Sequence, residues 1–153
     1  MQKKLILVSL LAVAVLLTGC AAENESEAPL REDLKTSSLS CIKVGYTYYF
    51  SGITARDPET NSYPEGMSGQ TKAVMDKYQT ALQELGLDWN NVVKVNVYIT
   101  DIADKPALNE AYAGYFEGFK HPCRVCVEAG LAGDAVVEIA IIAVKTQTHQ
   151  AQP

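Results

Sequence analysis

The chain has 153 residues, a formal net charge of −5 at pH 7 and 48% hydrophobic residues. These values are typical of one globular domain with a sizeable core. The acidic balance, without any cluster of Lys and Arg, excludes the basic patch that binding to a phosphate backbone requires, so we expect no nucleic-acid partner.

The first twenty residues have the pattern of an export signal. Two lysines precede the apolar residues 5–17, and a Leu-Thr-Gly-Cys sequence ends at Cys20. The apolar stretch is shorter than the roughly 20 residues of a membrane-spanning helix, and the four residues after it resemble the lipobox of bacterial lipoproteins. We therefore predict a lipoprotein signal peptide at 1–19, lipidation of Cys20, and an extracytoplasmic protein that its lipid anchors to the bacterial cell membrane. A plain secretory signal or an uncleaved anchor is the alternative.

Residues 20–35 are polar and acidic and lack any hydrophobic period. Such a segment cannot bury enough apolar surface to fold, so it predicts an acidic tether between the lipid and the domain. We place the domain at 36–147 and a tail at 148–153.

Strand patterns within the domain are runs rich in β-branched and aromatic residues, several of them alternating. They fall at 39–44, 46–51, 92–100, 123–128 and 135–145. In the third run the alternation predicts that one face carries Val93, Val95, Val97 and Ile99.

Two segments have the helical period instead. The first has Ser68 as a plausible N-cap and ends near Gly86. The second has Asp104 as a candidate cap and an aromatic stripe that runs to Phe119, which we expect to pack against the sheet. The order β-β-α-β-α-β-β predicts an α+β fold with two helices against a mostly strand-built layer.

The domain holds three cysteines, Cys41, Cys123 and Cys126. One disulfide is allowed in an oxidising compartment, but the sequence does not name the pair. In a strand, Cys123 and Cys126 point to opposite faces, which argues against a redox or metal motif, and we expect no metal site.

Two charges at the end of the chain suggest a site. Arg124 lies in a short strand, where a solvated edge face is one interpretation. Glu138 is the one charged side chain in residues 135–144, a run that looks buried on both faces, so it is either paired or held at a site. An arginine fork can hold a substrate carboxylate while a carboxylate polarises water, but a plain buried ion pair of the two stays open.

Three stretches of the domain resemble one known family. "CRVCVEAGLAGDAVVEIAIIAV" at 123–144 is similar to the C-terminal signature of the RidA family, also called YjgF/YER057c/UK114. "YYFSGITARDPETNSYP" at 48–64 resembles the family's strand that ends in Ser-Gly before a turn. "ALQELGLDWNNVVKVNVYITDIADKPALNEAYAGYF" at 81–116 resembles its helix, Gly-Leu turn, Val-Lys strand and Asn-x-x-Tyr helix.

The resemblance implies a chorismate-mutase-like α+β fold, a mixed sheet with two helices on one face, in a homotrimer with sites between subunits. It also implies hydrolysis of reactive 2-imino and enamine acids, such as 2-aminoacrylate, to 2-keto acids and ammonia without a cofactor.

Carried over by position, the resemblance assigns roles to six residues. Arg124 would clamp the substrate carboxylate and Glu138 would orient the attacking water. The remaining four would line the pocket or its rim: Ser51, Gly52, Asn109 and Cys126.

The sequence departs from the family pattern at two places. Thr36, Ser37 and Ser38 stand where catalytic members usually have Gly-Pro-Tyr, so the pocket tyrosine is absent. Asn61 replaces the turn glycine, which the tolerance of Asn for a left-handed backbone allows. Two other functions therefore stay open: a non-catalytic trimer that binds a small carboxylate, and a structural or interaction lipoprotein.

Overall fold

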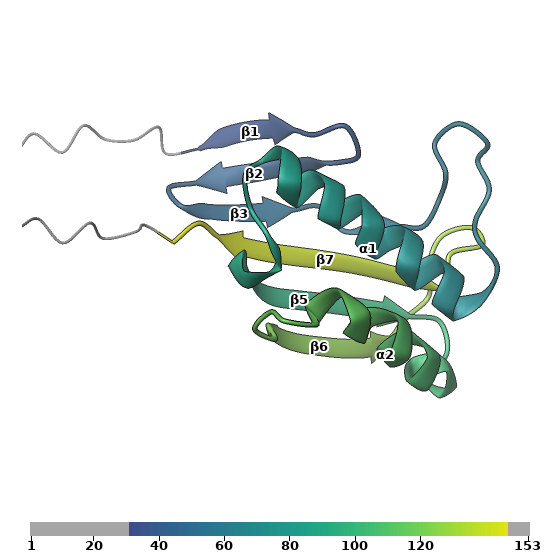
Figure 1. Cartoon of the computed structure of the whole chain (residues 1–153). Helices are drawn as coiled ribbons and strands as arrows, with labels where there is room; N and C mark the ends of the chain where they lie inside the picture. The colour runs from purple at the N-terminus through teal and green to yellow at the C-terminus, as the bar shows by residue number, and fades with distance from the viewer. Residues whose placement is uncertain (1–30, 147–153) are drawn as a thin grey trace, which may run out of the picture.

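The computed structural model describes residues 31–146. The predicted signal peptide, Cys20 and the predicted tail at 148–153 lie outside the described residues. Seven strands form one mixed sheet, and both α-helices lie on the same face of it (Figure 1). The elements in chain order are β1 (Glu32–Lys35), β2 (Ser40–Val44), β3 (Thr47–Phe50), β4 (Ile53–Thr54), α1 (Gly66–Glu84), β5 (Val92–Ile99), α2 (Lys105–Ala113), β6 (Cys123–Glu128) and β7 (Val137–Val144).

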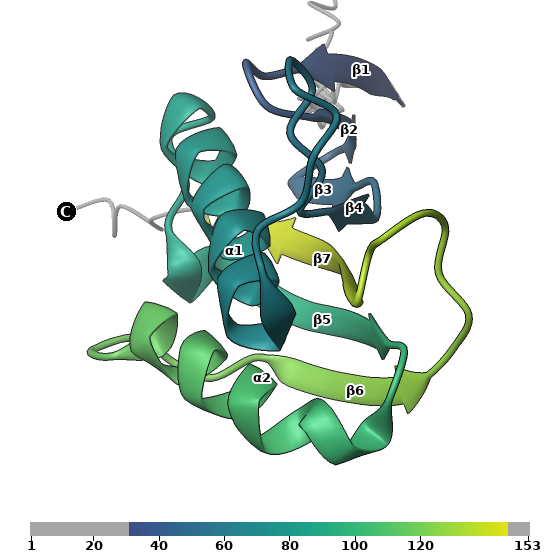
Figure 2. The same cartoon turned by 90° about the vertical axis from the view of Figure 1, so that its right-hand side faces the viewer.

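The sheet has the order β1-β2-β3-β7-β5-β6, and β4 pairs with β7 beyond the end of β3. Only β5 and β6 are parallel, and α2 makes the crossover between them. The view along the sheet shows α1 and α2 side by side over one face (Figure 2). The predicted α+β fold, with two helices on one face of a mixed sheet, is confirmed.

The core lies between the two helices and this covered face. On β5 and β7, alternate side chains are almost completely buried and meet the apolar faces of the helices, as a two-layer domain requires. The largest side chains with less than 2% exposure are Tyr78, Phe116, Met75, Leu82, Ile99, Leu108, Ile139 and Ile141.

The structure contains two strands, β1 and β4, that the predicted order lacks. Glu32–Lys35, which we assigned to the tether, form the edge strand β1 and pair with β2. Leu34 packs against the core, and Glu32 bonds Lys43 at 2.8 Å. One apolar side chain in four residues is too short a pattern to reveal a strand, since the backbone pairing with β2 supplies most of its stability.

Local details of β5 and the helices also differ from expectation. A register shift between Val92 and Lys94 turns Val92 into the core and leaves Val93 44% exposed, so Val93 does not share the buried face. Helix α1 begins at Gly66, so Ser68 lies inside its first turn rather than at the N-cap. Asp104 occupies the N-cap position of α2 without a side-chain bond, whereas Asp101 accepts a bond from the Ala103 amide.

The aromatic stripe packs on the core as predicted, but its helix is shorter. Helix α2 ends at Ala113, and a 3-10 turn, Gly114–Phe116, continues the chain. Phe116 is buried and Phe119 is partly buried. Gly86, with φ of +66°, follows the end of α1 as expected from its freedom in the left-handed region.

The second face of the sheet has no helix over it, and it is apolar. Val44, Tyr49, Val125 and Val127 are each 40–46% exposed on this open face. The expectation that β7 is buried on both faces is wrong for the single chain, because its side chains alternate between buried and half-buried. An apolar surface of this kind is typical of a face that a partner covers.

The three described cysteines are free thiols. Cys123 is exposed on the open face, and Cys126 is half-buried on the covered face, as the strand period predicted. No helix within residues 31–146 is long and apolar enough to cross a membrane.

The position of the core predicts the effect of truncating one β7 side chain. Ile141, 1% exposed, contacts the helices, so Ile141→Ala should lower the free energy of unfolding by about 2–5 kcal/mol through the cavity it leaves. Ile102→Ala, at a side chain 47% exposed, should change it by less than about 0.5 kcal/mol. Urea unfolding at one protein concentration measures both, and equal losses would contradict this position of the core.

Candidate functional site

Arg124 extends from β6 toward α2. It pairs with Val95 of β5, which is 1% exposed, so both side chains lie on the covered face. The guanidinium Nη2 donates to Oδ1 of Asn109 at 2.7 Å. Its carbon lies 4.6 Å from the centre of the Tyr112 ring, within the range of a cation–π contact. The interpretation of Arg124 as part of a solvated edge face is therefore wrong, although β6 is an edge strand.

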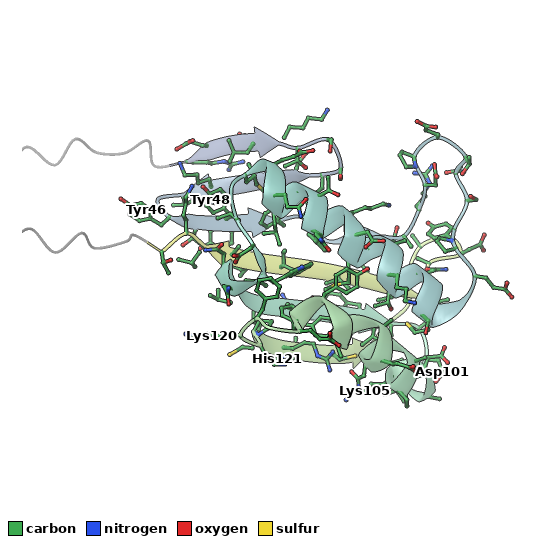
Figure 3. All side chains as sticks on the ribbon, in the orientation of Figure 1. Tyr46, Tyr48, Asp101, Lys105, Lys120 and His121 are labelled. Atoms are coloured by element: carbon green, nitrogen blue, oxygen red, sulfur yellow. The ribbon has the colours of Figure 1, made fainter. Side chains whose placement is uncertain are left out.

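A cleft of about 290 Å³ opens beside this arginine, lined by Asn109, Tyr112, Ala113, His121, Pro122 and Arg124. His121 lies two residues before β6 (Figure 3), and its ring stacks on that of Phe116, with the ring centres 5.7 Å apart. Cys126 follows Arg124 on the same face and packs against the core. A half-buried guanidinium with two fixed contacts presents its remaining N–H donors to a carboxylate in a defined direction.

The ring of Tyr112 packs against the guanidinium of Arg124. From the sequence, Tyr112 belongs to the aromatic stripe, to which we assigned only a packing role. It is 6% exposed, and its hydroxyl has no hydrogen-bond partner among the described residues. Burial raises the pKa of Tyr112 to about 12, although the positive charge of Arg124 opposes the shift. Tyr112 follows Asn109 by three residues, so both side chains lie on one face of α2. This spacing is the sequence signal that could have placed Tyr112 beside Asn109 at the site.

Glu138 lies elsewhere, on the open face. It pairs with Thr54 of β4 and Tyr98 of β5 and is half-buried. A Cβ on Gly52 would overlap the Glu138 carboxylate, whose carbon would lie 3.4 Å away. Glycine at 52 therefore leaves the space that this carboxylate occupies.

A bulge places Gly52 there. Tyr49 pairs with Ile142 and Ile53 with Ile139, so four steps along one strand match three along β7. The extra residue leaves Ser51 and Gly52 outside the pairing with β7, and both are exposed. Such bulges often lie beside active sites, where they redirect a side chain or end a pairing.

Tyr78 of α1 supports the bulge from the core. Its hydroxyl lies 2.8 Å from the carbonyl oxygen of Ser51 and 2.5 Å from that of Ile139. Burial raises the pKa of Tyr78, and the negative charge of Glu138 raises it further. Tyr78 is 0% exposed, and no local sequence pattern signals its contacts with Ser51 and Ile139.

The six predicted site residues thus form two groups. Arg124, Asn109 and Cys126 are together on the covered face, and Glu138, Ser51 and Gly52 are together at the bulge. Arg124 is aligned with Val95, and Glu138 with Tyr98; since these β5 residues are three apart, they point to opposite faces. Arg124 and Glu138 do not form an ion pair within the chain, so the simple buried pair is wrong.

The loop that carries Ser37 and Ser38 lies against α1. The Ser37 amide donates to Oε2 of Glu84 at 2.9 Å, and the Ser37 hydroxyl also bonds this carboxylate. Asn61 has a φ of 61°, so it adopts the left-handed conformation that its turn was expected to need.

The two buried tyrosines predict opposite effects on stability. Tyr112→Phe removes a buried hydroxyl without a partner, so it should leave the free energy of unfolding unchanged or raise it by about 1 kcal/mol. Tyr78→Phe removes the single hydroxyl proton that lies between the carbonyls of Ser51 and Ile139, and should lower the free energy of unfolding by about 1–3 kcal/mol. Urea unfolding of the two variants gives the comparison, and a larger loss for Tyr112→Phe would show that its hydroxyl is bonded.

Comparisons with known proteins give the family and the fold of this chain. The family model for endoribonuclease L-PSP matches residues 36–145. A RutC family protein of Pyrococcus abyssi is 41% identical over 106 residues, which are 68% of this chain and 83% of that protein. Among solved structures, a Rid family protein of unknown function from Yersinia pestis has a TM-score of 0.70 and 29% identity, covering 75% of this chain and 99% of that one. RidA from a Psychrobacter species has a TM-score of 0.63 and 32% identity, covering 77% and 97%. The chain therefore belongs to the endoribonuclease L-PSP family, the family of the RidA and YjgF proteins.

Proposed function

We propose that this protein hydrolyses reactive 2-imino and enamine acids to 2-keto acids and ammonia, in a homotrimer whose sites lie between subunits. The observation that carries the proposal is the arginine clamp: Arg124 is oriented by Asn109 and Tyr112 at the wall of an open cleft. Membership of the RidA family is consistent with this activity. The family description names an endoribonuclease, but a net charge of −5 does not favour an RNA substrate.

Assembly would unite the two groups of site residues. The open face is apolar beside Glu138, and covering it with another copy removes that surface from water. A second chain that brings its cleft to this face would set Arg124 of one copy opposite Glu138 of the other. The two groups then need not meet within one chain.

The proposed reaction uses two side chains, Arg124 and Glu138, and one water molecule. Arg124 binds the substrate carboxylate through its free N–H donors, and this orients the C=N carbon. Glu138 accepts a proton from a water as the water oxygen bonds to that carbon. The proton passes from Glu138 to the imine nitrogen, which gives the carbinolamine. Its hydroxyl proton then passes to the same nitrogen as the C–N bond breaks, the C=O bond forms and ammonia leaves. The product is the 2-keto acid, and no electrons leave the substrate.

An assay with 2-iminobutanoate tests the activity. An amino-acid oxidase generates the imine in situ, and release of 2-ketobutanoate is followed with and without the protein. Arg124→Ala should lower kcat/KM by about 100-fold or more, since the anchor and its orientation are lost together. Glu138→Gln should lower kcat by about 10²–10⁴-fold, the usual contribution of a general base.

Matched controls separate these effects from changes of charge. Arg31→Ala and Glu65→Gln alter exposed residues of the same types that belong to neither group and should keep wild-type rates. If the wild-type protein does not accelerate ketoacid release from several imino acids, the proposed activity is wrong.

One observation favours a non-catalytic alternative. Ser37 is held by Glu84 and Ser38 is a small residue, so this loop brings no tyrosine hydroxyl to the site. A trimer of this kind would bind a small carboxylate at Arg124 without turnover. Thermal unfolding then distinguishes the two, because 2-ketobutanoate would raise Tm in an Arg124-dependent way while the imine assay stays at the spontaneous rate.

A further inference from the structure

A second cavity lies at the edge of β4, away from the arginine cleft. It has a volume of about 420 Å³ and is bounded by β4, the loop before β2, the loop after β4 and one side of α1. Its lining residues are Ser37, Ser38, Ile53, Thr54, Arg56, Pro58 and Lys77. None of them lines the cleft beside Arg124.

Lys77 places a positive charge in this wall. The side chain of this helix residue is half-buried, and its Nζ donates to the carbonyl oxygen of Arg56 at 2.7 Å and to that of Thr54 at 3.2 Å. An ammonium has three N–H donors, so one remains for a further acceptor. Burial lowers the pKa of Lys77, and the carboxylate of Asp57 partly opposes this shift.

Arg56 adds a second positively charged side chain to the lining of the cavity. Its Nε donates to Oδ1 of Asn61 in the turn that follows, which fixes the direction of the guanidinium. This bond engages only Nε, and a guanidinium has five N–H donors in a planar fork. The fork suits a carboxylate or phosphate group, which it can bind with two parallel hydrogen bonds.

Neither cation is neutralised by a salt bridge. The ion pairs within residues 31–146 are Arg31–Asp33 and Lys43–Glu32. Two carboxylates on the neighbouring segments bond other donors. Asp57 accepts the amides of Glu59 and Thr60 at 2.8 and 3.0 Å. Glu84 accepts the amide and hydroxyl of Ser37.

We propose that this cavity binds a small oxyanion, a carboxylate or phosphate group, between Arg56 and Lys77. The Ser38 hydroxyl lines the same cavity and supplies a third donor. The small side chains at 37 and 38 leave the volume open, whereas an aromatic ring at 38 would occupy part of it. The cavity lies next to the bulge, because Thr54 in its lining pairs with Glu138, but Arg56 and Lys77 take no part in the proposed hydrolysis, so either assignment stands without the other.

Calorimetric titration of the full chain with inorganic phosphate, and separately with succinate, tests the proposal. The ionic strength is held constant with sodium chloride, so that a general salt effect gives no heat of binding. At least one of the two anions should bind saturably. Lys77→Met and Arg56→Gln should each weaken that binding by about tenfold or more, because each removes a charged hydrogen-bond donor.

Two variants serve as controls. Lys72→Met changes an exposed lysine of the same helix and should bind the anion as the wild type does, within about twofold. Arg124→Ala removes the other candidate carboxylate site, so the saturable binding that depends on Lys77 and Arg56 should persist in this variant. Arg56 is exposed, so Arg56→Gln decides the test if Lys77→Met does not fold. The proposal is overturned if the wild type binds neither anion, if Lys72→Met weakens binding as much as Lys77→Met, or if Arg124→Ala abolishes it. Loss of imine hydrolysis with intact anion binding would count against the proposed function alone.

Discussion

Both helices lie on one face of the sheet, and the alternation of side chains along the strands makes this the decisive constraint on the molecule. Every side chain of β5, β6 and β7 points either under the helices or to the open face. The covered face supplies a conventional two-layer core. The open face is nearly as apolar along β7 but has no described layer of its own chain over it.

The same alternation separates the chemically important groups. Arg124 is fixed under α2 by a hydrogen bond and an aromatic ring, whereas Glu138 lies on the other face beside the bulge at Gly52, where a Cβ would overlap its carboxylate. Each group is well supported: Tyr112 lies beneath the arginine, and Tyr78 holds the bulge through two carbonyls. Neither Arg124 nor Glu138 forms an ion pair with a described residue of its own chain. This is expected if the two are halves of one site that forms when another copy covers the open face.

Much of the fold could be predicted because its signals are local. The period of two in β5 and β6 and the helical period of α1 predicted elements that the structure contains. The aromatic stripe that runs to Phe119 predicted α2, although this helix ends earlier, at Ala113. The misses have physical causes. Strand β1 depends on its pairing with β2 rather than on its own residue pattern. The register shift at Val92 turns Val93 away from the covered face, and the residue types of the strand give no sign of this shift.

The candidate site was harder to predict from sequence, since period two separates residues only within a strand. Period two places Arg124 and Val125 on opposite faces of β6. Whether Arg124 and Glu138 share a face depends instead on two registers, that of β6 with β5 and that of β7 with β5. The resemblance supplied the residues, and the registers show that one chain keeps them apart. Tyr78 depends on contacts of α1 with the bulge and with β7, and the cationic cavity at Lys77 depends on a contact of α1 with β4; no local pattern records either.

Mixed assemblies of two inactive variants test the division of the site between subunits most directly. Arg124→Ala and Glu138→Gln are refolded together in equal amounts, and subunit exchange is verified by mass. If each site takes its arginine from one chain and its glutamate from a neighbour, about a quarter of the sites in random cyclic assemblies regain both groups, so the mixture should recover about a quarter of wild-type imine hydrolysis. Mixed assemblies that are no more active than the separate variants would contradict the account.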